Sequence, residues 1–132
     1  MARQVKVLIA DDEEHVRNLL RVVCDSISGI TVIGEAADGK ELMEKFSQSL
    51  PDIVLLDINM PHVTGIEALA QIRDIDPNVA VVMLTSLNSS DVVRQCISGG
   101  AKTYILKNNS TDKIRNAIKQ VAFDQLRRVS GA

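Results

Sequence analysis

The stretch IVLLDINMP, residues 53–61, joins an apolar run to an aspartate with no turn between them. Its first four residues are all branched aliphatics, and Pro51 stands shortly before them, so the run is short and bounded on its amino-terminal side. A short apolar run bounded in this way is typical of a strand that is buried on both faces of a sheet. The sequence therefore predicts a buried strand whose carboxyl end carries the charge of Asp57.

Length and composition are those of one globular domain. The chain has 132 residues, of which 45% are hydrophobic and 24% charged, and we expect it to fold unaided without an internal linker. The formal net charge of −2 gives no overall basic footprint, so we expect no direct binding of nucleic acid. No apolar stretch approaches the ~20 residues of a membrane span, which predicts no membrane association and a cytoplasmic location by default.

Hydrophobic periodicity alternates between two patterns along the chain. Five runs rich in aliphatic and β-branched residues predict strands at residues 5–10, 30–36, 52–57, 79–85 and 103–107. Between and after them, apolar residues recur at three- and four-residue spacing, which predicts five helices. Five strands alternating with five helices imply an α/β fold, a doubly wound parallel sheet with helices on both faces.

The same spacing predicts which helix side chains face the sheet. They are Val16, Leu19, Leu20, Val23 and Ile27; Leu42, Met43, Phe46 and Leu50; Ile66, Leu69, Ile72 and Ile75; Val92, Val93, Cys96 and Ile97; and Ile114, Ala117, Ile118 and Val121. Cys24 and Cys96 stand far apart inside these patterns, so we expect buried free thiols. His15 and His62 have no ligand partner at useful spacing and are expected at the surface.

Residues capable of chemistry follow four of the predicted strands. They are Asp11 and Asp12 after the first, Asp57 at the end of the third, Thr85 at the end of the fourth and Lys107 at the end of the fifth. Because the carboxyl ends of parallel strands meet at one edge, these side chains are expected to lie together. Singly, each has a plain structural explanation such as a helix cap or a strand end. Jointly they predict a site.

The chemistry of that site follows from its charges. Three clustered carboxylates repel one another, and a hard divalent cation is the simplest means of keeping them ionised. Oxygen ligands alone favour Mg²⁺. A phosphoryl group is then the natural ligand, with Asp57 as the nucleophile, Lys107 neutralising its oxygens and Thr85 donating a hydrogen bond.

Five segments carry a resemblance to a known family: VLIADDEE, EAADGKEL, PDIVLLDINMPHVTGIEAL, VVMLTS and GGAKTYILK. In this order and spacing, the sequence resembles a response-regulator receiver domain, the CheY-like module of two-component signal transduction, over nearly its whole length. The resemblance implies a flavodoxin-like fold with strand order 2-1-3-4-5. It also implies a phosphorylation-dependent switch and not an enzyme, because a receiver catalyses only its own phosphotransfer and dephosphorylation.

The resemblance assigns roles around the phosphoryl group. Asp57 would accept it from the phosphohistidine of a sensor histidine kinase or of a phosphotransfer protein. Thr85 and Lys107 match the family's phosphate-contacting hydroxyl and lysine. Tyr104, the only tyrosine of the chain, matches the switch aromatic, which turns inward when Thr85 moves toward the phosphate.

Metal binding and signal lifetime are also implied by the resemblance. Asp12 and Asp57 would bind Mg²⁺ directly, together with the backbone carbonyl of Asn59, while Asp11 would act through water. Asn59 and Leu87 occupy the two positions that influence access of hydrolytic water in this family. Because Leu87 offers no base to activate water, we hypothesise that it gives hydrolysis no assistance.

One departure from the family concerns Lys107. The family lysine is commonly followed by a proline through a cis peptide bond, whereas Lys107 precedes Asn108. A cis bond before a residue other than proline costs ~3–4 kcal/mol, so it would persist only as strain held by the site. We nevertheless predict that the Lys107–Asn108 bond is cis.

Two functions of other classes compete with a receiver. A haloacid-dehalogenase-like phosphohydrolase also uses an aspartate nucleophile at a strand end, but its second aspartate two residues later is replaced here by Asn59, which cannot transfer a proton. A nucleotide-binding flavodoxin-like module would need a glycine-rich loop after the first strand. The acidic run at residues 11–14 stands there instead.

The output of a receiver is left open by the sequence. We expect the receiver domain to occupy residues 1–125, with 126–132 forming a tail or the start of a linker. The chain is then either a stand-alone receiver or the excised N-terminal receiver of a DNA-binding transcriptional regulator. In either case the family's signalling surface, formed by the fourth helix, fifth strand and fifth helix, would meet a downstream protein or a second copy. It would present Asp91, Gln95, Tyr104, Asn109 and Lys113.

Overall fold

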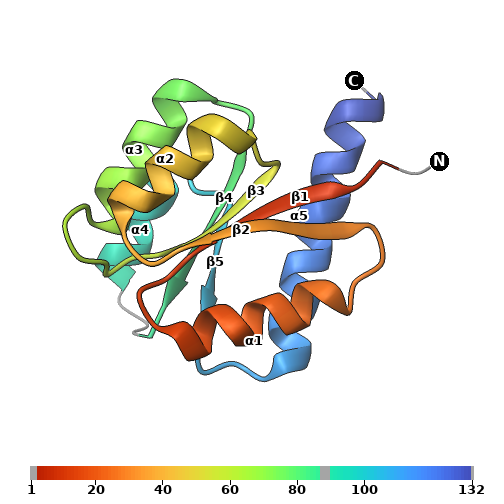
Figure 1. The fold of residues 1–132 in the computed structure, drawn as a ribbon, viewed down its shortest axis with the longest axis horizontal. Coiled ribbons are helices and arrows are strands. Elements are labelled where there is room, and N and C mark those ends of the chain that lie inside the picture. The colour runs from red at the N-terminus through yellow and green to blue at the C-terminus, as the bar shows by residue number, and fades with distance from the viewer. Residues whose placement is uncertain (1–2, 87–89, 132) are drawn as a thin grey trace.

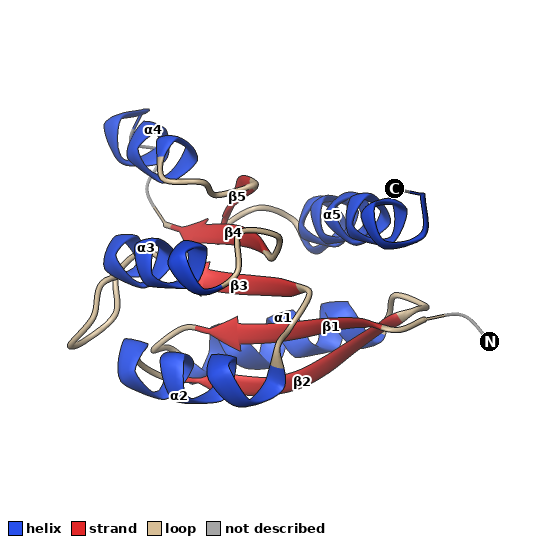
Figure 2. Ribbon diagram, turned by 90° about the horizontal axis from the view of Figure 1, so that it is seen from above, coloured by secondary structure: helices blue, strands red, loops and turns tan. Residues whose placement is uncertain are grey.

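The computed structural model describes residues 3–86 and 90–131, which form a parallel sheet covered by helices on both faces (Figure 1, Figure 2). The strands are β1 (Val5–Ala10), β2 (Ile30–Ala36), β3 (Ile53–Asp57), β4 (Ala80–Thr85) and β5 (Thr103–Leu106), in the spatial order 2-1-3-4-5. The helices are α1 (Glu14–Asp25), α2 (Gly39–Ser49), α3 (Gly65–Ile75), α4 (Ser90–Ser98) and α5 (Thr111–Gly131). The predicted doubly wound fold is confirmed.

Two apolar clusters lie on opposite faces of the sheet. Val7 and Ile9 of β1 pack in the cluster beneath α1 and α5, whereas Leu8 and Ala10 pack in the cluster beneath α2, α3 and α4. This alternation follows from the two-residue repeat of a strand. Every residue of β3 and β4 is buried, as the apolar run before Asp57 predicted. Since each buried aliphatic side chain contributes about 1.5–3 kcal/mol, the central strands form a rigid platform.

The helix-face prediction was wrong for four apolar side chains. Leu19, Leu50, Ile75 and Ile97 are 38%, 59%, 54% and 45% exposed, respectively. Leu19 and Ile97 each stand one position from a buried residue, and one position turns the side chain about 100° around the helix. Leu50 lies outside α2, as its C-cap residue with a φ of 48°, and Ile75 is the last residue of α3. These four side chains therefore do not lie on the buried faces of their helices.

Other expectations for single residues are confirmed. Cys24 and Cys96 are buried free thiols, and burial raises the pKa of both, which keeps them protonated and unreactive. His15 and His62 are exposed. No helix among the described residues has both the length and the apolar character needed to cross a membrane.

Helix α5 is anchored at the amino ends of the central strands. The buried side-chain amide of Gln125 donates hydrogen bonds to the carbonyl oxygens of Asp52 (2.9 Å) and Asn78 (3.1 Å), just before β3 and β4. The carboxylate of Asp52 also forms an ion pair with Arg3 (2.5 Å). Residues 126–131 continue this helix, and the domain boundary at residue 125 stays a prediction.

The turn between β3 and α3 depends on Gly65. Its backbone N–H donates to the carbonyl oxygen of Ile58 (2.8 Å). A Cβ atom at this position would lie 2.2 Å from the carbonyl oxygen of Asp57 and 2.7 Å from the Cα atom of Ile58. Both atoms belong to the backbone, which cannot move aside as a flexible side chain can. Gly65 thus lets α3 start against the strand end that carries Asp57.

We expect Gly65→Ala to lower the free energy of unfolding by about 2–3 kcal/mol, because the added methyl overlaps backbone atoms. Urea denaturation followed by circular dichroism measures this change. The matched control is Gly34→Ala, where the nearest atom to the new Cβ is the movable Leu8 side chain at 3.3 Å. Equal stability of the two variants would contradict this account of the turn.

Candidate functional site

The predicted site residues gather at the carboxyl edge of the sheet. Asp57 and Thr85 end β3 and β4, and Asp11 directly follows β1. Parallel pairing keeps these ends level: the backbone N–H of Lys107 donates to the carbonyl oxygen of Thr85 (2.8 Å). Asp11, Asp57 and Thr85 are 0%, 3% and 5% exposed. Two carboxyl groups and a hydroxyl are thus buried at one end of an apolar sheet.

The Lys107 ammonium group lies among three carboxylates. Its Nζ atom is 2.8 Å from Asp11 Oδ2, 3.1 Å from Asp57 Oδ1 and 3.4 Å from Glu13 Oε1. The Lys107 side chain is 12% exposed and that of Glu13 is 46% exposed, so Glu13 approaches from the rim. Glu13 was not among the predicted site residues. The acidic run at residues 11–14 was the signal that could have found it.

The carboxylates of Asp11, Asp12 and Asp57 offer ligand atoms within 4.8 Å of one another. The Oδ2 atom of Asp11 is buried and, apart from its ion pair with Lys107, accepts no hydrogen bond from the described residues. Asp12 is exposed, which leaves the site open on one side. An all-oxygen donor set of this size fits a hard cation such as Mg²⁺, which keeps several of its own waters.

Burial and the neighbouring charge of Asp11 raise the pKa of Asp57 to about 6. Lys107 and the backbone N–H of Asn59, which donates to Asp57 Oδ1 at 3.2 Å, act in the opposite direction and only partly offset the rise. Burial by itself lowers the pKa of Lys107, but Asp11 and Asp57 outweigh burial and raise it. The lysine therefore stays charged, and the site has one positive charge for two buried carboxylates.

Three further predicted residues lie around this centre. Asn59 is exposed at the start of the β3–α3 loop. Tyr104 lies on β5, 37% exposed, and faces outward beside a surface hollow that it lines with Val93 and Ile97 of α4. Leu87 lies outside the described residues. The roles assigned to these side chains stay predictions.

The prediction of a cis Lys107–Asn108 bond was wrong. No peptide bond among residues 3–86 and 90–131 is cis, so this bond is trans. The physical reason is the cost of ~3–4 kcal/mol for a cis bond that does not precede proline. Asn108 lacks the proline ring that reduces the free-energy difference between cis and trans. With the trans bond, Lys107 still contacts the carboxylates of Asp11 and Asp57.

Comparison with known proteins assigns the family. The family model for the response regulator receiver domain matches residues 7–119, and the chain belongs to this family. It is 35% identical to the chemotaxis protein CheY of Thermotoga maritima over 117 residues, which cover 89% of this chain and 97% of that protein. The recognition made from the sequence motifs is confirmed, and the chain is a receiver domain of the response-regulator type.

Other relatives are longer. The chain is 35% identical to the uncharacterized transcriptional regulatory protein YxjL of Bacillus subtilis over 119 residues, and 38% identical to the response regulator VraR of Staphylococcus saprophyticus over 116. These matches cover 90% and 88% of this chain but only 55% and 56% of those proteins. The chain therefore spans about half the length of these two relatives.

Solved structures agree with this family. CheY in the CheX–CheY–BeF₃–Mg²⁺ complex from Borrelia burgdorferi superposes with a TM-score of 0.84 at 35% identity, covering 90% of each chain. The receiver domain of NarL from Mycobacterium tuberculosis gives a TM-score of 0.85 at 27% identity, covering 92% of this chain and 98% of that one. Both share the doubly wound sheet described above.

The raised pKa of Asp57 predicts how stability depends on pH. The folded protein holds this proton more tightly than the unfolded chain does. The cost of ionising Asp57 therefore lowers stability as the pH rises from about 4 to about 6, and it is fully present above about pH 6. We expect Asp57→Asn to raise the free energy of unfolding by about 1–3 kcal/mol near pH 7.5 in metal-free buffer. The gain should shrink as the pH falls from about 6 to 4.

Urea denaturation across this pH range measures the difference. Asp74→Asn is the control, because Asp74 is an exposed carboxylate on α3. If Asp57→Asn lowered the free energy of unfolding, or raised it by an amount that does not change with pH, the ionised Asp57 would not be the cause of the lost stability.

Proposed function

We propose that this receiver is switched by phosphorylation of Asp57, with the phosphohistidine of a sensor histidine kinase or of a phosphotransfer protein as donor. The observation that carries the proposal is the Asp57 carboxylate, buried at the end of β3 with Lys107 Nζ 3.1 Å away. A carboxylate oxygen of Asp57 would attack phosphorus and form the P–O bond. The P–N bond would break, and its electron pair would return to the imidazole nitrogen.

The neighbouring residues have separate tasks in this reaction. Lys107 would bind the negatively charged phosphoryl oxygens while the phosphoryl group is transferred to Asp57, and the Thr85 hydroxyl would donate a hydrogen bond to one of these oxygens. Asp12, Asp57 and the backbone carbonyl of Asn59 would hold Mg²⁺, with Asp11 acting through water. The cation would neutralise part of the charge on the phosphoryl oxygens.

The switch proposed here links Thr85 to Tyr104. Thr85 would move toward the phosphoryl group, and Tyr104 would turn inward into the space that Thr85 leaves. The partly exposed position of Tyr104 beside Val93 and Ile97 supports this proposal, because an inward turn would change that surface hollow. To change the populations decisively, the phosphoryl group must favour one arrangement by several kcal/mol, about 5.5 for a full reversal from 1:99 to 99:1.

Signal lifetime is proposed to depend on Asn59 and Leu87. Neither side chain is a base that could activate water for hydrolysis of the aspartyl phosphate. Asn59 is exposed two positions after Asp57, a place that is compatible with an influence on the access of water to the aspartyl phosphate. Hydrolysis that receives no assistance from Leu87 is therefore part of the proposal.

The output proposed is a protein contact through the face formed by α4, β5 and α5. Asp91, Gln95 and Lys113 are exposed on it. A second copy, a separate protein or a further domain would bind there, and the chain itself would bind neither nucleic acid nor membrane. The two forms proposed for the whole protein are a stand-alone receiver in the cytoplasm and the N-terminal receiver of a DNA-binding regulator. Relatives of both lengths occur, since the chain matches nearly all of CheY and about half of YxjL.

A phosphohydrolase is the remote alternative. Such an enzyme needs a proton donor two residues after its aspartate nucleophile, and Asn59 has an amide there. The receiver family, whose members act as signalling switches, also fits a protein that is not an enzyme. Turnover of phosphate monoesters without a lasting aspartyl phosphate would favour the alternative.

The test of the proposal is intact mass after incubation with Mg²⁺ and acetyl phosphate. We expect a mass increase of one phosphoryl group in the unmodified chain and none in Asp57→Asn. The Asp57→Asn variant is isosteric, so it keeps the site's shape while losing the nucleophile. An equal mass increase in both proteins would place phosphorylation elsewhere and overturn the proposal.

Size-exclusion chromatography of the same samples tests the output. Earlier elution of the phosphorylated protein, absent from Asp57→Asn, would indicate that a second copy binds to the switched face. Unchanged elution would favour a different partner. If acetyl phosphate transfers nothing, binding of beryllium fluoride distinguishes a receiver that needs its kinase from one that has lost the chemistry.

A further inference from the structure

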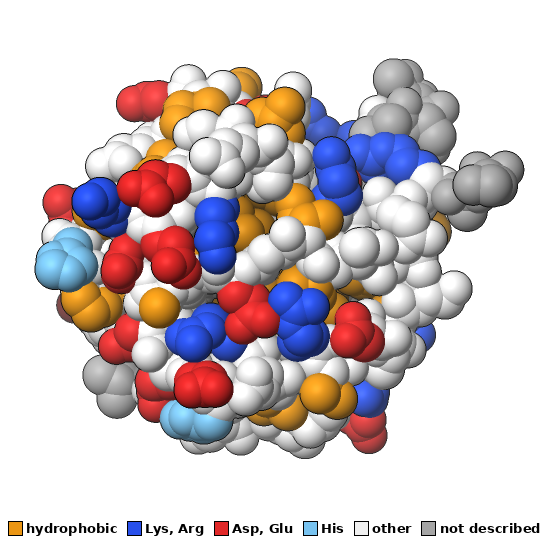
Figure 3. Space-filling view, in the orientation of Figure 1, with side chains coloured by type: hydrophobic (Ala, Val, Ile, Leu, Met, Phe, Trp, Pro, Cys, Tyr) orange, Lys and Arg blue, Asp and Glu red, His pale blue; other side chains and the backbone are white. Residues whose placement is uncertain are grey.

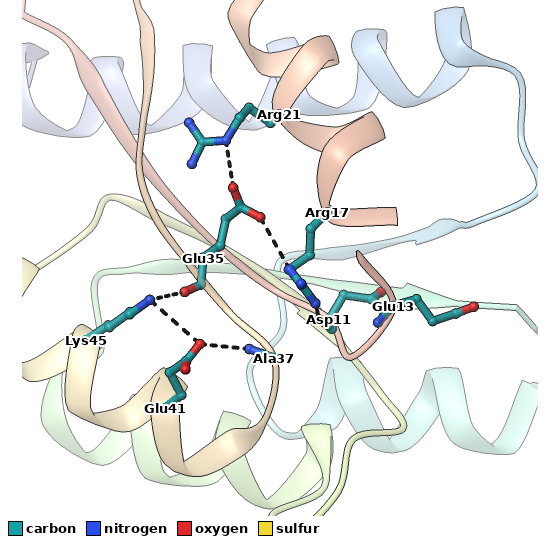
Figure 4. A network of polar contacts seen from close by, with 8 residues as sticks. All are labelled: Asp11, Glu13, Arg17, Arg21, Glu35, Ala37, Glu41 and Lys45. Carbon is teal, nitrogen blue, oxygen red and sulfur yellow. Dashed lines mark hydrogen bonds and ion pairs between the residues drawn. The ribbon is translucent and has the colours of Figure 1, made fainter. Parts of the chain in front are cut away.

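The guanidinium group of Arg17 joins the loop after β1 to strand β2 (Figure 4). Its Nη1 atom donates a hydrogen bond to the backbone carbonyl oxygen of Asp11 at 2.7 Å, and its Nε atom lies 3.3 Å from Glu35 Oε1. The Arg17 side chain is only 17% exposed. Arg17 lies on α1, so its guanidinium group reaches back to the loop that precedes this helix.

Glu35 is itself held from both neighbouring helices. Arg21 Nε of α1 donates to Glu35 Oε2 at 2.7 Å, and Lys45 Nζ of α2 donates to the Glu35 backbone carbonyl. Lys45 also lies 3.6 Å from Glu41. Acidic and basic side chains intermingle on this face of the molecule (Figure 3). The Glu35 carboxylate therefore has a fixed place, and through it the Arg17 guanidinium does too.

The bond from Arg17 restrains the peptide between Asp11 and Asp12. That peptide is planar, so fixing the direction of the Asp11 carbonyl also fixes the Asp12 N–H and limits where the Asp12 side chain can point. The Asp11 N–H donates to the Ala36 carbonyl (3.0 Å), and Asp11 Oδ1 accepts from the Glu13 N–H (2.9 Å). Arg17 supplies the restraint on the carbonyl, next to two of the three clustered carboxylates.

We propose that Arg17, held in place by Glu35, is a positioning residue that orients Asp11 and Asp12 for a divalent cation. This inference rests on the proposed function in one respect, that the carboxylate cluster binds Mg²⁺. Groups that orient metal ligands through hydrogen bonds commonly change metal affinity by tenfold or more when removed. The Arg17 side chain would act on the backbone of the loop that holds Asp11 and Asp12, and it would not contact the cation itself.

The direction of the effect separates positioning from charge. Arg17 carries a positive charge near the cluster, so its removal would strengthen Mg²⁺ binding if only Coulomb repulsion mattered. A positioning role predicts the opposite, a weaker site. Arg21 offers a matched control, because it carries the same charge and binds the same Glu35 carboxylate, but among the described residues no hydrogen bond or ion pair joins it to Asp11.

The experiment is a Mg²⁺ titration of the unphosphorylated protein, followed by backbone amide signals in ¹⁵N–¹H NMR spectra. We expect the dissociation constant to rise roughly tenfold in Arg17→Met. In Arg21→Met it should rise by about twofold at most, because this change loosens Glu35 but keeps the hydrogen bond from Arg17 to Asp11. The amide spectra also report whether each variant is folded. Glu35→Gln, which leaves Arg17 without its charged anchor, is expected to weaken binding by a smaller factor and serves if Arg17→Met does not fold.

Each outcome has a separate meaning. Unchanged or tighter Mg²⁺ binding in Arg17→Met, or in Glu35→Gln where Arg17→Met does not fold, overturns the positioning role. Equal weakening in Arg17→Met and Arg21→Met assigns the effect to general loosening of α1 and also overturns it. If the unmodified protein binds no Mg²⁺ at the cluster, the metal part of the proposed function fails, and with it the premise of this inference.

Discussion

The ammonium group of Lys107 holds two buried carboxylates together, and the rest of the site depends on that contact. Asp11 and Asp57 lie at the ends of adjacent strands, where burial and repulsion from Asp11 both disfavour the charge of Asp57. One lysine offsets only part of this cost, as the raised pKa of Asp57 indicates. The proposed binding of a cation rests on the remaining negative charge, so the same imbalance that opposes folding would favour the proposed chemistry.

The sequence predicted the sheet and the centre of the site well, for a physical reason. Buried parallel strands are continuous apolar runs, and polar residues at their carboxyl ends are conspicuous against them. Asp57 after four aliphatic residues is the clearest case. Once the strands were placed, parallel topology alone brought Asp11, Asp57, Thr85 and Lys107 to one edge. The chemistry of these groups could therefore be inferred before any distance was known.

What the sequence did not predict depends on side-chain direction and on long-range pairing. Ile97 fits an apolar helix pattern as well as Cys96 does, but one step around α4 turns it to solvent. Arg17 looks like an ordinary helix arginine, because its partners Asp11 and Glu35 lie on other elements. The trans bond after Lys107 was not predicted, because the cis bond common in this family precedes a proline and Asn108 stands in that position here. Such features are set by packing and not by local pattern.

Asp52 marks the end of the sheet opposite to the site. Gln125 of α5 and Arg3 near the other end of the described chain both bind this residue, at the amino end of β3. Asp57 stands at the other end of the same strand, roughly 15 Å away at the usual rise per residue. A tether, dye or immobilising surface attached through either of these two anchored segments would therefore sit at the end opposite to the site and leave the carboxyl edge of the sheet free to meet a phosphodonor.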